Sequence, residues 1–235
     1  MHLLDNPIWN ALTSSQVHFA LGGSRARRFP PAVTALAAFP EESGEAYDEL
    51  SRLADGAPAG LFLHAAPNLP EGWAQVREAV LLQMVHEQQA ALSPRHEWIA
   101  LSESDVPEMV ALAELTQPGP FGPRTYQMGT YLGVRERGRL AAMAGERLRV
   151  PGYAEISAVC THPEHVGKGY AASLMSALIE KMRSQGETPF LHVRADNHRA
   201  IALYERLGFR KRVQFHLAVI QKQAVDAMRT EAVVK

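Results

Sequence analysis

The sequence has one cysteine, almost no excess of charge and no long apolar run, and each absence excludes a class of protein. Cys160 has no second cysteine to pair with, so an internal disulfide is excluded and a reducing, cytoplasmic setting is expected. The 24 lysines and arginines nearly balance the 25 aspartates and glutamates, so no nucleic-acid or membrane partner is indicated. No apolar run approaches the roughly 18 residues of a membrane span. The first residues also lack the cationic and apolar segments of a signal peptide.

What remains is the composition of an ordinary globular protein, in a chain that we expect to divide near residue 94. Residues 1–94 carry weak patterns and no catalytic motif. They predict short strands at 17–21 and 61–64, and helices at 45–54 and 73–83. This smaller α/β N-terminal domain is either a degenerate copy of the fold that follows it or an accessory element that shapes a substrate site or a dimer contact.

Residues 95–235 show much clearer strand and helix patterns. In chain order these predict a strand at 98–101, a helix after Ser104-Asp105, strands at 130–136, 140–148 and 154–160, a helix at 170–185, a strand at 190–194, a helix capped by Asn197 and a strand at 213–219. The hairpin turns Arg137-Gly138 and Pro151-Gly152 predict antiparallel neighbours. The strands on either side of the 170–185 helix should be parallel. The predicted fold class is therefore α/β, with a mixed, partly antiparallel sheet and helices on both faces.

The most informative stretch is 154–171, AEISAVCTHPEHVGKGYA, in which a strand with a carboxylate leads to a glycine-rich turn that opens a helix. Alternation predicts two faces for the strand, with Ile156, Ala158 and Cys160 on one and Glu155, Ser157 and Val159 on the other. The glycines at 167 and 169 let the backbone come close to a ligand. The unpaired N–H groups of the next helix attract an anion. The segment predicts an anion site beside a carboxylate.

The same glycines also satisfy the dinucleotide pattern G-x-G-x-x-A, through Gly167, Gly169 and Ala172. In dinucleotide sites the turn follows its strand almost directly and opens a doubly wound sheet. Here the residues THPEHV intervene and antiparallel hairpins come first, so the context argues against a dinucleotide. A phosphate-binding P-loop is weaker still, because the sequence has no G-K-[ST].

Residues 97–220 resemble the GNAT superfamily of acetyl-CoA-dependent N-acetyltransferases. Two segments carry the resemblance: VGKGYA at 166–171 follows Q/R-x-x-G-x-G/A at a helix start, and NHRAIALYERLGF at 197–209 follows N-x-x-A-x-x-x-Y-x-x-x-G-F. Val166 departs from the family pattern, which usually has Gln or Arg there. That position contributes largely through its backbone N–H, so we still expect cofactor binding.

The resemblance implies acetyl-CoA as cosubstrate and no metal. The pantetheine arm would follow the strand that ends at Cys160, where a backbone N–H near Val159 holds the thioester oxygen. The pyrophosphate would bind the glycine turn, with Lys168 and Arg199 meeting its charge. The implied cofactor-binding set is Ala158, Val159, Cys160, Val166, Gly167, Lys168, Gly169, Tyr170, Ala171, Asn197 and Arg199.

The resemblance also implies an acid and a base for transfer to a primary amine. Deprotonating an amine of pKa about 10.4 at pH 7 costs roughly 4 to 5 kcal/mol, so a base is useful. Glu155 matches a base position, and Glu146 on the preceding strand is a rival. Tyr204 matches the tyrosine that protonates the departing thiolate. Each residue also has a structural interpretation: Glu155 as a solvated strand residue, Tyr204 as a core residue and Asn197 as a helix cap alone.

We therefore expect an N-acetyltransferase that moves an acetyl group from acetyl-CoA to a small-molecule or peptide amine by direct attack in a ternary complex. The loop 117–124 would cover the acceptor, with Phe121 at its tip. Cys160 and His162 lack an orienting partner for a thiol nucleophile, and His162, His165 and His198 lack metal-site spacing. The alternative is a non-catalytic acyl-CoA-binding regulatory module. The expected partner is the amine substrate, and a homodimer is a possible assembly.

Overall fold

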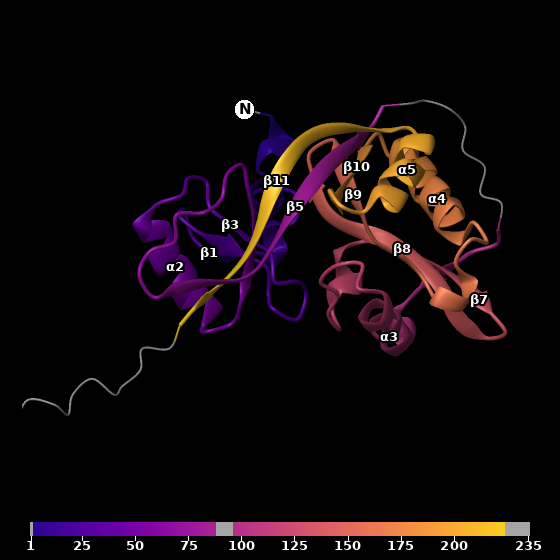
Figure 1. The fold of residues 1–235 in the computed structure, drawn as a ribbon, viewed down its shortest axis with the longest axis horizontal. Coiled ribbons are helices and arrows are strands. Elements are labelled where there is room, and N and C mark those ends of the chain that lie inside the picture. Colours follow the sequence, from indigo (N-terminus) through magenta and orange to yellow (C-terminus); the bar gives the residue numbers. More distant parts are fainter. Residues whose placement is uncertain (1, 88–95, 224–235) are drawn as a thin grey trace, which may run out of the picture.

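One twisted, eight-stranded sheet runs through the whole molecule (Figure 1). The computed structural model describes residues 2–87 and 96–223. In spatial order the strands are β4 (Ala59–Leu63), β11 (Phe209–Lys222), β5 (Trp73–His86), β10 (Thr188–Arg194), β9 (Tyr153–Thr161), β8 (Arg139–Val150), β7 (Tyr131–Glu136) and β6 (Ile99–Leu101). Only β9 and β10 are parallel neighbours, and the other pairs are antiparallel. The predicted mixed sheet is confirmed.

Helices cover both faces of this sheet. They are α1 (Pro7–Leu12), α2 (Gly44–Ala54), α3 (Val106–Thr116), α4 (Tyr170–Ser184) and α5 (His198–Arg206). Successive residues of β8 show the two sides: Ala142 and Ala144 pack in one cluster with α4 and α5, whereas Met143 packs with α3. Farther along β8, Leu148 packs with α1. Apolar side chains at alternate positions of β8 thus pack against different helices on the two faces of the sheet.

Strands from the N-terminal residues belong to the same sheet as the rest. In Figure 1 the long strands β5 and β11 join a lobe around α2 to the lobe that holds α3, α4 and α5. The α2 lobe also has a small sheet of β1 (Leu21–Gly22), β2 (Arg27–Arg28) and β3 (Ala37–Ala38). Because β4 and β5 both precede residue 94, the large sheet is continuous across the division that the sequence predicts.

The helix predicted at 73–83 is wrong, because this segment is the central strand β5. Its side chains alternate between two cores: Leu81 packs on the α1 side, whereas Leu82 and Met84 pack on the α4 side. The first half of β5 is largely exposed and only its second half is buried on both faces, so its sequence lacks the alternation of a half-buried strand, and sheet pairing overrides its local helix propensity. The strand predicted at 17–21 is mostly a 3₁₀ turn, η2 (Val17–Phe19). The helix at 45–54 and the strand at 61–64 are confirmed to within a residue or two.

A β-bulge in β9 changes which of its side chains share a face. Ala158 and Val159 together lie opposite Ala144 of β8, and Ala158 has φ +52°. As a result Ala158 and Cys160 pack with α3, whereas Ile156 and Val159 pack with α4. The predicted grouping of Ile156 with Ala158 and Cys160 is therefore wrong. An inserted residue shifts the alternation of every residue after it, and sequence alternation cannot show this.

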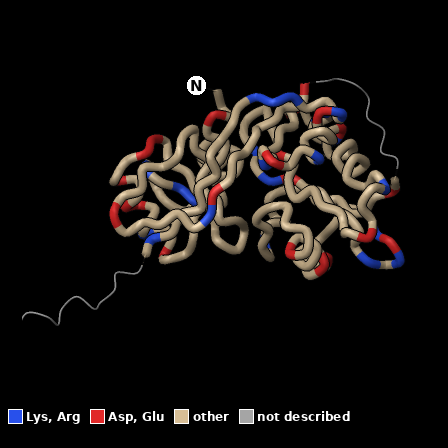
Figure 2. Tube along the Cα trace, viewed as in Figure 1, with Lys and Arg blue, Asp and Glu red and all other residues tan. Residues whose placement is uncertain are grey.

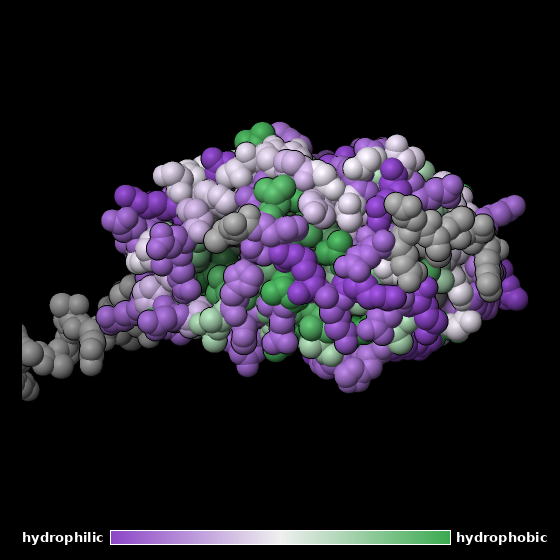
Figure 3. Space-filling view, turned by 90° about the horizontal axis from the view of Figure 1, so that it is seen from above, coloured by the Kyte–Doolittle hydropathy of each residue, from purple (hydrophilic) through white to green (hydrophobic). Residues whose placement is uncertain are grey.

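The surface carries mixed charges on both lobes (Figure 2), as expected from the near balance of acidic and basic residues. Seen from above, apolar surface lies in the middle of the molecule and more hydrophilic surface lies toward its two ends (Figure 3). None of the helices in the described residues is long and apolar enough to cross a membrane.

Candidate active site

The parallel strands β9 and β10 separate soon after they begin. They pair only from Tyr153 to Glu155 on β9, and β10 then pairs with β5 as far as Arg194. Beyond Glu155, the edge of β9 that faces β10 has no strand partner among the described residues. Its backbone groups are therefore available to an extended ligand that pairs like a strand. Ala158, Val159 and Cys160, predicted to contact the pantetheine arm, lie on this part of β9.

The glycine turn after β9 has the shape of an anion cradle. Gly167 and Gly169 have φ values of +92° and +88°, which side chains with a Cβ rarely adopt. Among the described residues, a Cβ built on Gly167 meets nothing within 4 Å. The first helical bond joins the Ser173 N–H to the Gly169 carbonyl, 3.1 Å away. The N–H groups of Tyr170 and Ala171 precede it and have no helical acceptor.

Side chains around this turn are held at its surface. The Lys168 ammonium lies 3.1 Å from Nδ1 of His165 and 3.7 Å from the carboxylate of Glu136. The Tyr170 hydroxyl also donates to Glu136, so the Tyr170 side chain braces the turn while its N–H faces the cradle. Val166 is half-exposed with an extended backbone, and its N–H donates to the Pro163 carbonyl at 3.4 Å, so a cofactor contact through this N–H stays a prediction.

Asn197 is confirmed as a helix cap: its side chain accepts the Ala200 N–H at 3.1 Å at the start of α5. Arg199 is exposed in the first turn of the same helix. Contact between its guanidinium and a phosphate stays a prediction of the resemblance.

A cluster of three possible metal ligands, which the residue spacing in the sequence did not predict, lies just before the glycine turn. The 3₁₀ turn η5 (Pro163–His165) brings ligand atoms of His162, Glu164 and His165 within 4.8 Å of one another. The Lys168 ammonium beside His165 opposes a bound cation at this place.

Glu155 is enclosed in a fully satisfied ion pair. Its Oε1 accepts from Arg147 at 2.6 Å and from Nδ1 of His192 at 2.7 Å. Its Oε2 accepts from Arg147 at 2.8 Å and from the Leu148 N–H at 3.2 Å. Burial alone would raise the pKa of this carboxyl, but Arg147 and His192 outweigh burial and lower the pKa from 4.5 to about 2. Such a carboxylate is a very weak base with no free lone pair, so the solvated interpretation does not hold either.

The neighbours of Glu155 fix the tautomer of His192. The Gln83 side chain accepts from Arg212 at 2.8 Å through its oxygen, so its NH2 group lies 3.1 Å from Nε2 of His192. An amide NH2 only donates, so Nε2 accepts and Nδ1 carries the proton that is donated to Glu155. Burial also lowers the His192 pKa, which keeps the ring neutral. The same Gln83 amide donates to the Leu4 carbonyl, which ties this network to the N-terminal residues.

The rival base Glu146 is also paired. Its two oxygens accept from Lys181 and from Arg149, each at 2.8 Å, and its side chain is 4% exposed. Both candidate carboxylates are therefore occupied by cations in this state of the protein.

Tyr204 and Cys160 come close enough for the thiol to act on the pKa of the phenol. Burial is the main cause that raises the pKa of Tyr204 to about 12. Tyr204 also packs in the apolar cluster of α4 and α5. Burial likewise raises the pKa of the Cys160 thiol to about 11, so the thiol is not an activated nucleophile.

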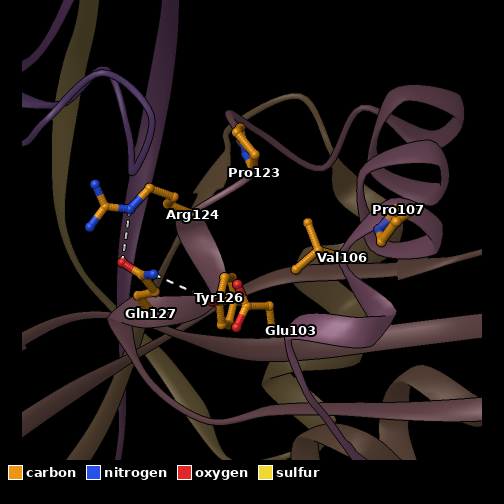
Figure 4. Close-up of a pocket in the computed structure, with 7 residues that line it drawn as sticks. All are labelled: Glu103, Val106, Pro107, Pro123, Arg124, Tyr126 and Gln127. Atoms are coloured by element: carbon orange, nitrogen blue, oxygen red, sulfur yellow. Dashed lines mark hydrogen bonds between the residues drawn. The ribbon is translucent and has the colours of Figure 1, made fainter.

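The loop at 117–124 lies over the α3 side of the sheet. The Phe121 ring meets the Tyr131 ring edge-on, with centroids 5.6 Å apart. Next to this loop lies an open surface pocket of about 520 Å³ (Figure 4). Its lining residues are Glu103, Val106, Pro107, Pro123, Arg124, Tyr126 and Gln127. Tyr126 also packs against the cluster that contains Ala158, so the pocket adjoins the bulge side of the sheet.

Known proteins are similar to this chain in sequence and in fold. A GNAT-family protein from Novosphingobium aromaticivorans, of known crystal structure, is 40% identical; the match covers 95% of this chain and all of that one, with a TM-score of 0.87. This chain belongs to the GNAT superfamily. The FR47-like protein family matches residues 131–217. The [ribosomal protein bS18]-alanine N-acetyltransferase of Escherichia coli K12 is 30% identical over 116 residues, which are 47% of this chain and 78% of that protein.

GNAT membership makes the protein an acyltransferase, as the sequence predicted. The Escherichia coli relative covers about half of the chain, whereas the Novosphingobium protein covers nearly all of it. The α2 lobe therefore occurs in a second GNAT protein. A GNAT enzyme from Kribbella flavida shares the fold over 89% of this chain, at 18% identity and a TM-score of 0.56.

Proposed function

We propose that the protein transfers an acetyl group from acetyl-CoA to a primary amine by direct attack within a ternary complex. The observation that carries the proposal is the edge of β9 that has no strand partner among the described residues, with its bulge at Ala158, a few residues before the glycine turn that opens α4. Pantetheine amides pair with this edge, and the pyrophosphate occupies the glycine turn, where the N–H groups of Tyr170 and Ala171 at the start of α4 have no helical acceptor.

The reaction needs one nucleophile, the removal of two protons from its nitrogen and the delivery of one proton to sulfur. An ammonium acceptor first loses a proton, and the neutral nitrogen then attacks the thioester carbon. The carbon–sulfur bond breaks, the nitrogen loses a second proton and the CoA thiolate gains one. The net products are an amide, CoA thiol and one proton. A backbone N–H near Val159, on the unpaired edge of β9, stabilises the carbonyl oxygen as it becomes negative.

Proton removal falls to water and not to a free carboxylate in this proposal. Glu155 is already ion-paired with Arg147, and Glu146 with Lys181 and Arg149. Glu155 then acts by holding Arg147 and His192 in place beneath β9. Glu155→Gln and Glu146→Gln variants test direct proton transfer: a rate that loses its pH dependence in either variant would restore that carboxylate as the base.

Tyr204 supports the leaving thiolate by hydrogen bonding. A phenol of pKa about 12 gives its proton to a thiolate whose thiol has pKa about 8.5 only with a penalty of roughly 5 kcal/mol. A hydrogen bond from the same hydroxyl avoids that penalty and still stabilises negative charge on sulfur.

The acceptor that we favour is the α-amino group of a peptide or protein. Support comes from the relative that is named as acetylating an alanine of a ribosomal protein, at 30% identity. The open pocket beside Phe121 offers Glu103, Arg124 and Gln127 as polar groups for a peptide backbone. The single buried Cys160 fits a reducing compartment such as the cytoplasm.

Incubation with acetyl-CoA and amines tests the proposal. The panel holds a pentapeptide with a free N-terminal alanine, its N-blocked form carrying an internal lysine, and a small diamine. CoA release is followed together with the product mass. Acetylation of the free peptide alone supports an N-terminal acceptor. Binding of acetyl-CoA without transfer to any of these amines would instead favour the non-catalytic acyl-CoA-binding module.

A further inference from the structure

The side chain of Tyr131 reaches across the sheet toward the bulge of β9. Tyr131 on β7 pairs with Gly145 on β8, and Gly145 pairs with Ser157 on β9. Because Gly145 has no side chain, the ring lies over its backbone: a Cβ built on Gly145 would be 2.2 Å from Cδ1 of Tyr131. The ring therefore lies along the row of paired residues Tyr131, Gly145 and Ser157, and Ser157 is the residue before Ala158.

The Tyr131 hydroxyl is close enough to four ionisable groups for them to act on its pKa. These groups are Arg147, Glu155, Glu146 and Cys160. Tyr131 also packs in the same cluster as Ala158 and Cys160. The hydroxyl thus lies on the side of β9 that faces α3, next to the place where β9 leaves β10.

This hydroxyl has no hydrogen-bond partner within residues 2–87 and 96–223, although Tyr131 is only 2% exposed. A buried polar group without a partner costs free energy, so a phenylalanine would serve packing alone at least as well. Burial also raises the Tyr131 pKa, so the phenol stays neutral and keeps both a proton and free lone pairs.

We propose that the Tyr131 hydroxyl binds the amine of the acceptor substrate, an inference that rests on the proposed function. Its oxygen accepts one N–H of the neutral amine. That bond directs the nitrogen lone pair away from Tyr131 and toward the thioester at the bulge. No covalent bond forms or breaks at Tyr131, so its contribution is binding and orientation.

Phe121 packs against the ring that carries this hydroxyl in the free protein. Its ring meets Tyr131 edge-on from the loop at 117–124, where Gly119 has φ +138°. The acceptor amine enters between the two rings from the adjoining pocket, and Phe121 moves aside to admit it. Tyr126 lines that pocket and packs on the same cluster as Tyr131, so the pocket adjoins the cluster that holds Tyr131.

The test compares Tyr131→Phe with Tyr153→Phe. Tyr153 is a matched control, because it lies at the start of β9 and its hydroxyl bonds to His2 at the surface. The probes are acetyl-CoA and the pentapeptide with a free N-terminal alanine, or the amine of the panel that the wild type acetylates fastest. The readouts are kcat and KM for the amine, calorimetric binding of acetyl-CoA and the melting temperature.

For Tyr131→Phe we expect an unchanged or higher melting temperature and acetyl-CoA binding within twofold of wild type. The KM for the amine should rise, which lowers kcat/KM about tenfold, the effect of losing one good hydrogen bond. Tyr153→Phe should match wild type in kcat/KM. If the wild type is active and Tyr131→Phe keeps kcat/KM within twofold of wild type, this inference is overturned and the proposed function stands. A wild type that binds acetyl-CoA and acetylates no amine overturns the inference together with the proposed function.

Discussion

The carboxylate of Glu155 and the guanidinium of Arg147 meet through two parallel hydrogen bonds, 2.6 and 2.8 Å long, inside the sheet core. Glu155 is fully buried and Arg147 nearly so. Removal of the negative charge would leave a cation buried without its partner. The position expected from the resemblance to hold a general base therefore holds half of a structural ion pair in the free protein.

Glu155→Gln should lower the free energy of unfolding by about 3 to 5 kcal/mol, because Arg147 keeps its charge and loses its counter-ion. Urea unfolding at neutral pH measures this loss. Glu180→Gln on the exposed side of α4 is the matched control and should change stability by less than about 0.5 kcal/mol. Equal stabilities of the Glu155 variant and wild type would contradict the ion-pair account.

The same pair predicts a pH dependence of stability. Because the folded pKa of Glu155 is lowered from 4.5 to about 2, its contribution is present above about pH 4.5 and is lost as the pH falls toward 2. The stability gap between wild type and Glu155→Gln should therefore be constant near neutrality and shrink in acid. A gap that widens as the pH falls would show that the carboxyl is not the charged partner.

Tyr204→Phe should lower kcat only modestly, by about two- to tenfold, because a hydrogen bond to the thiolate is lost and no proton donor is removed. The KM for acetyl-CoA should stay within twofold. Steady-state kinetics with the amine that the wild type acetylates fastest measure both quantities. A loss of a thousandfold or more would mean that Tyr204 transfers the proton itself.

Gly167 and Gly152 form a natural comparison for the cofactor turn. Both have positive φ, and a Cβ on either meets nothing within 4 Å, but Gly152 lies in the β8–β9 hairpin. Alanine at either place should cost about 1 to 2 kcal/mol of stability through backbone strain. Only Gly167→Ala should also weaken acetyl-CoA binding. Equal acetyl-CoA affinity in both variants would place the pyrophosphate elsewhere.

The glycine turn and the β8–β9 hairpin could be predicted from the sequence because local chemistry decides both: only glycine tolerates these φ values, and Pro151-Gly152 sets a tight turn. The cap at Asn197 is local in the same sense. Residues 73–83 were mispredicted as a helix because the pairing partners of β5, which are β10 and β11, lie more than a hundred residues away in the sequence. Tertiary pairing outweighed its local preference.

Details of the site that depend on partners from other strands of the sheet could not be predicted from the sequence either. The enclosure of Glu155 requires Arg147 from β8 and His192 from β10. The bulge at Ala158 is a property of the β8–β9 register and not of either strand alone. The Tyr131 hydroxyl could have been singled out only by knowing that Gly145 lies opposite it.

Calorimetric titration of the purified protein with acetyl-CoA, with NADH as the control nucleotide, tests the central claim most directly. We predict micromolar binding of acetyl-CoA at one site per chain, and no binding of NADH. NADH binding with equal affinity, or no heat with acetyl-CoA, would contradict the assignment of the β9 edge and the glycine turn to an acyl-CoA site.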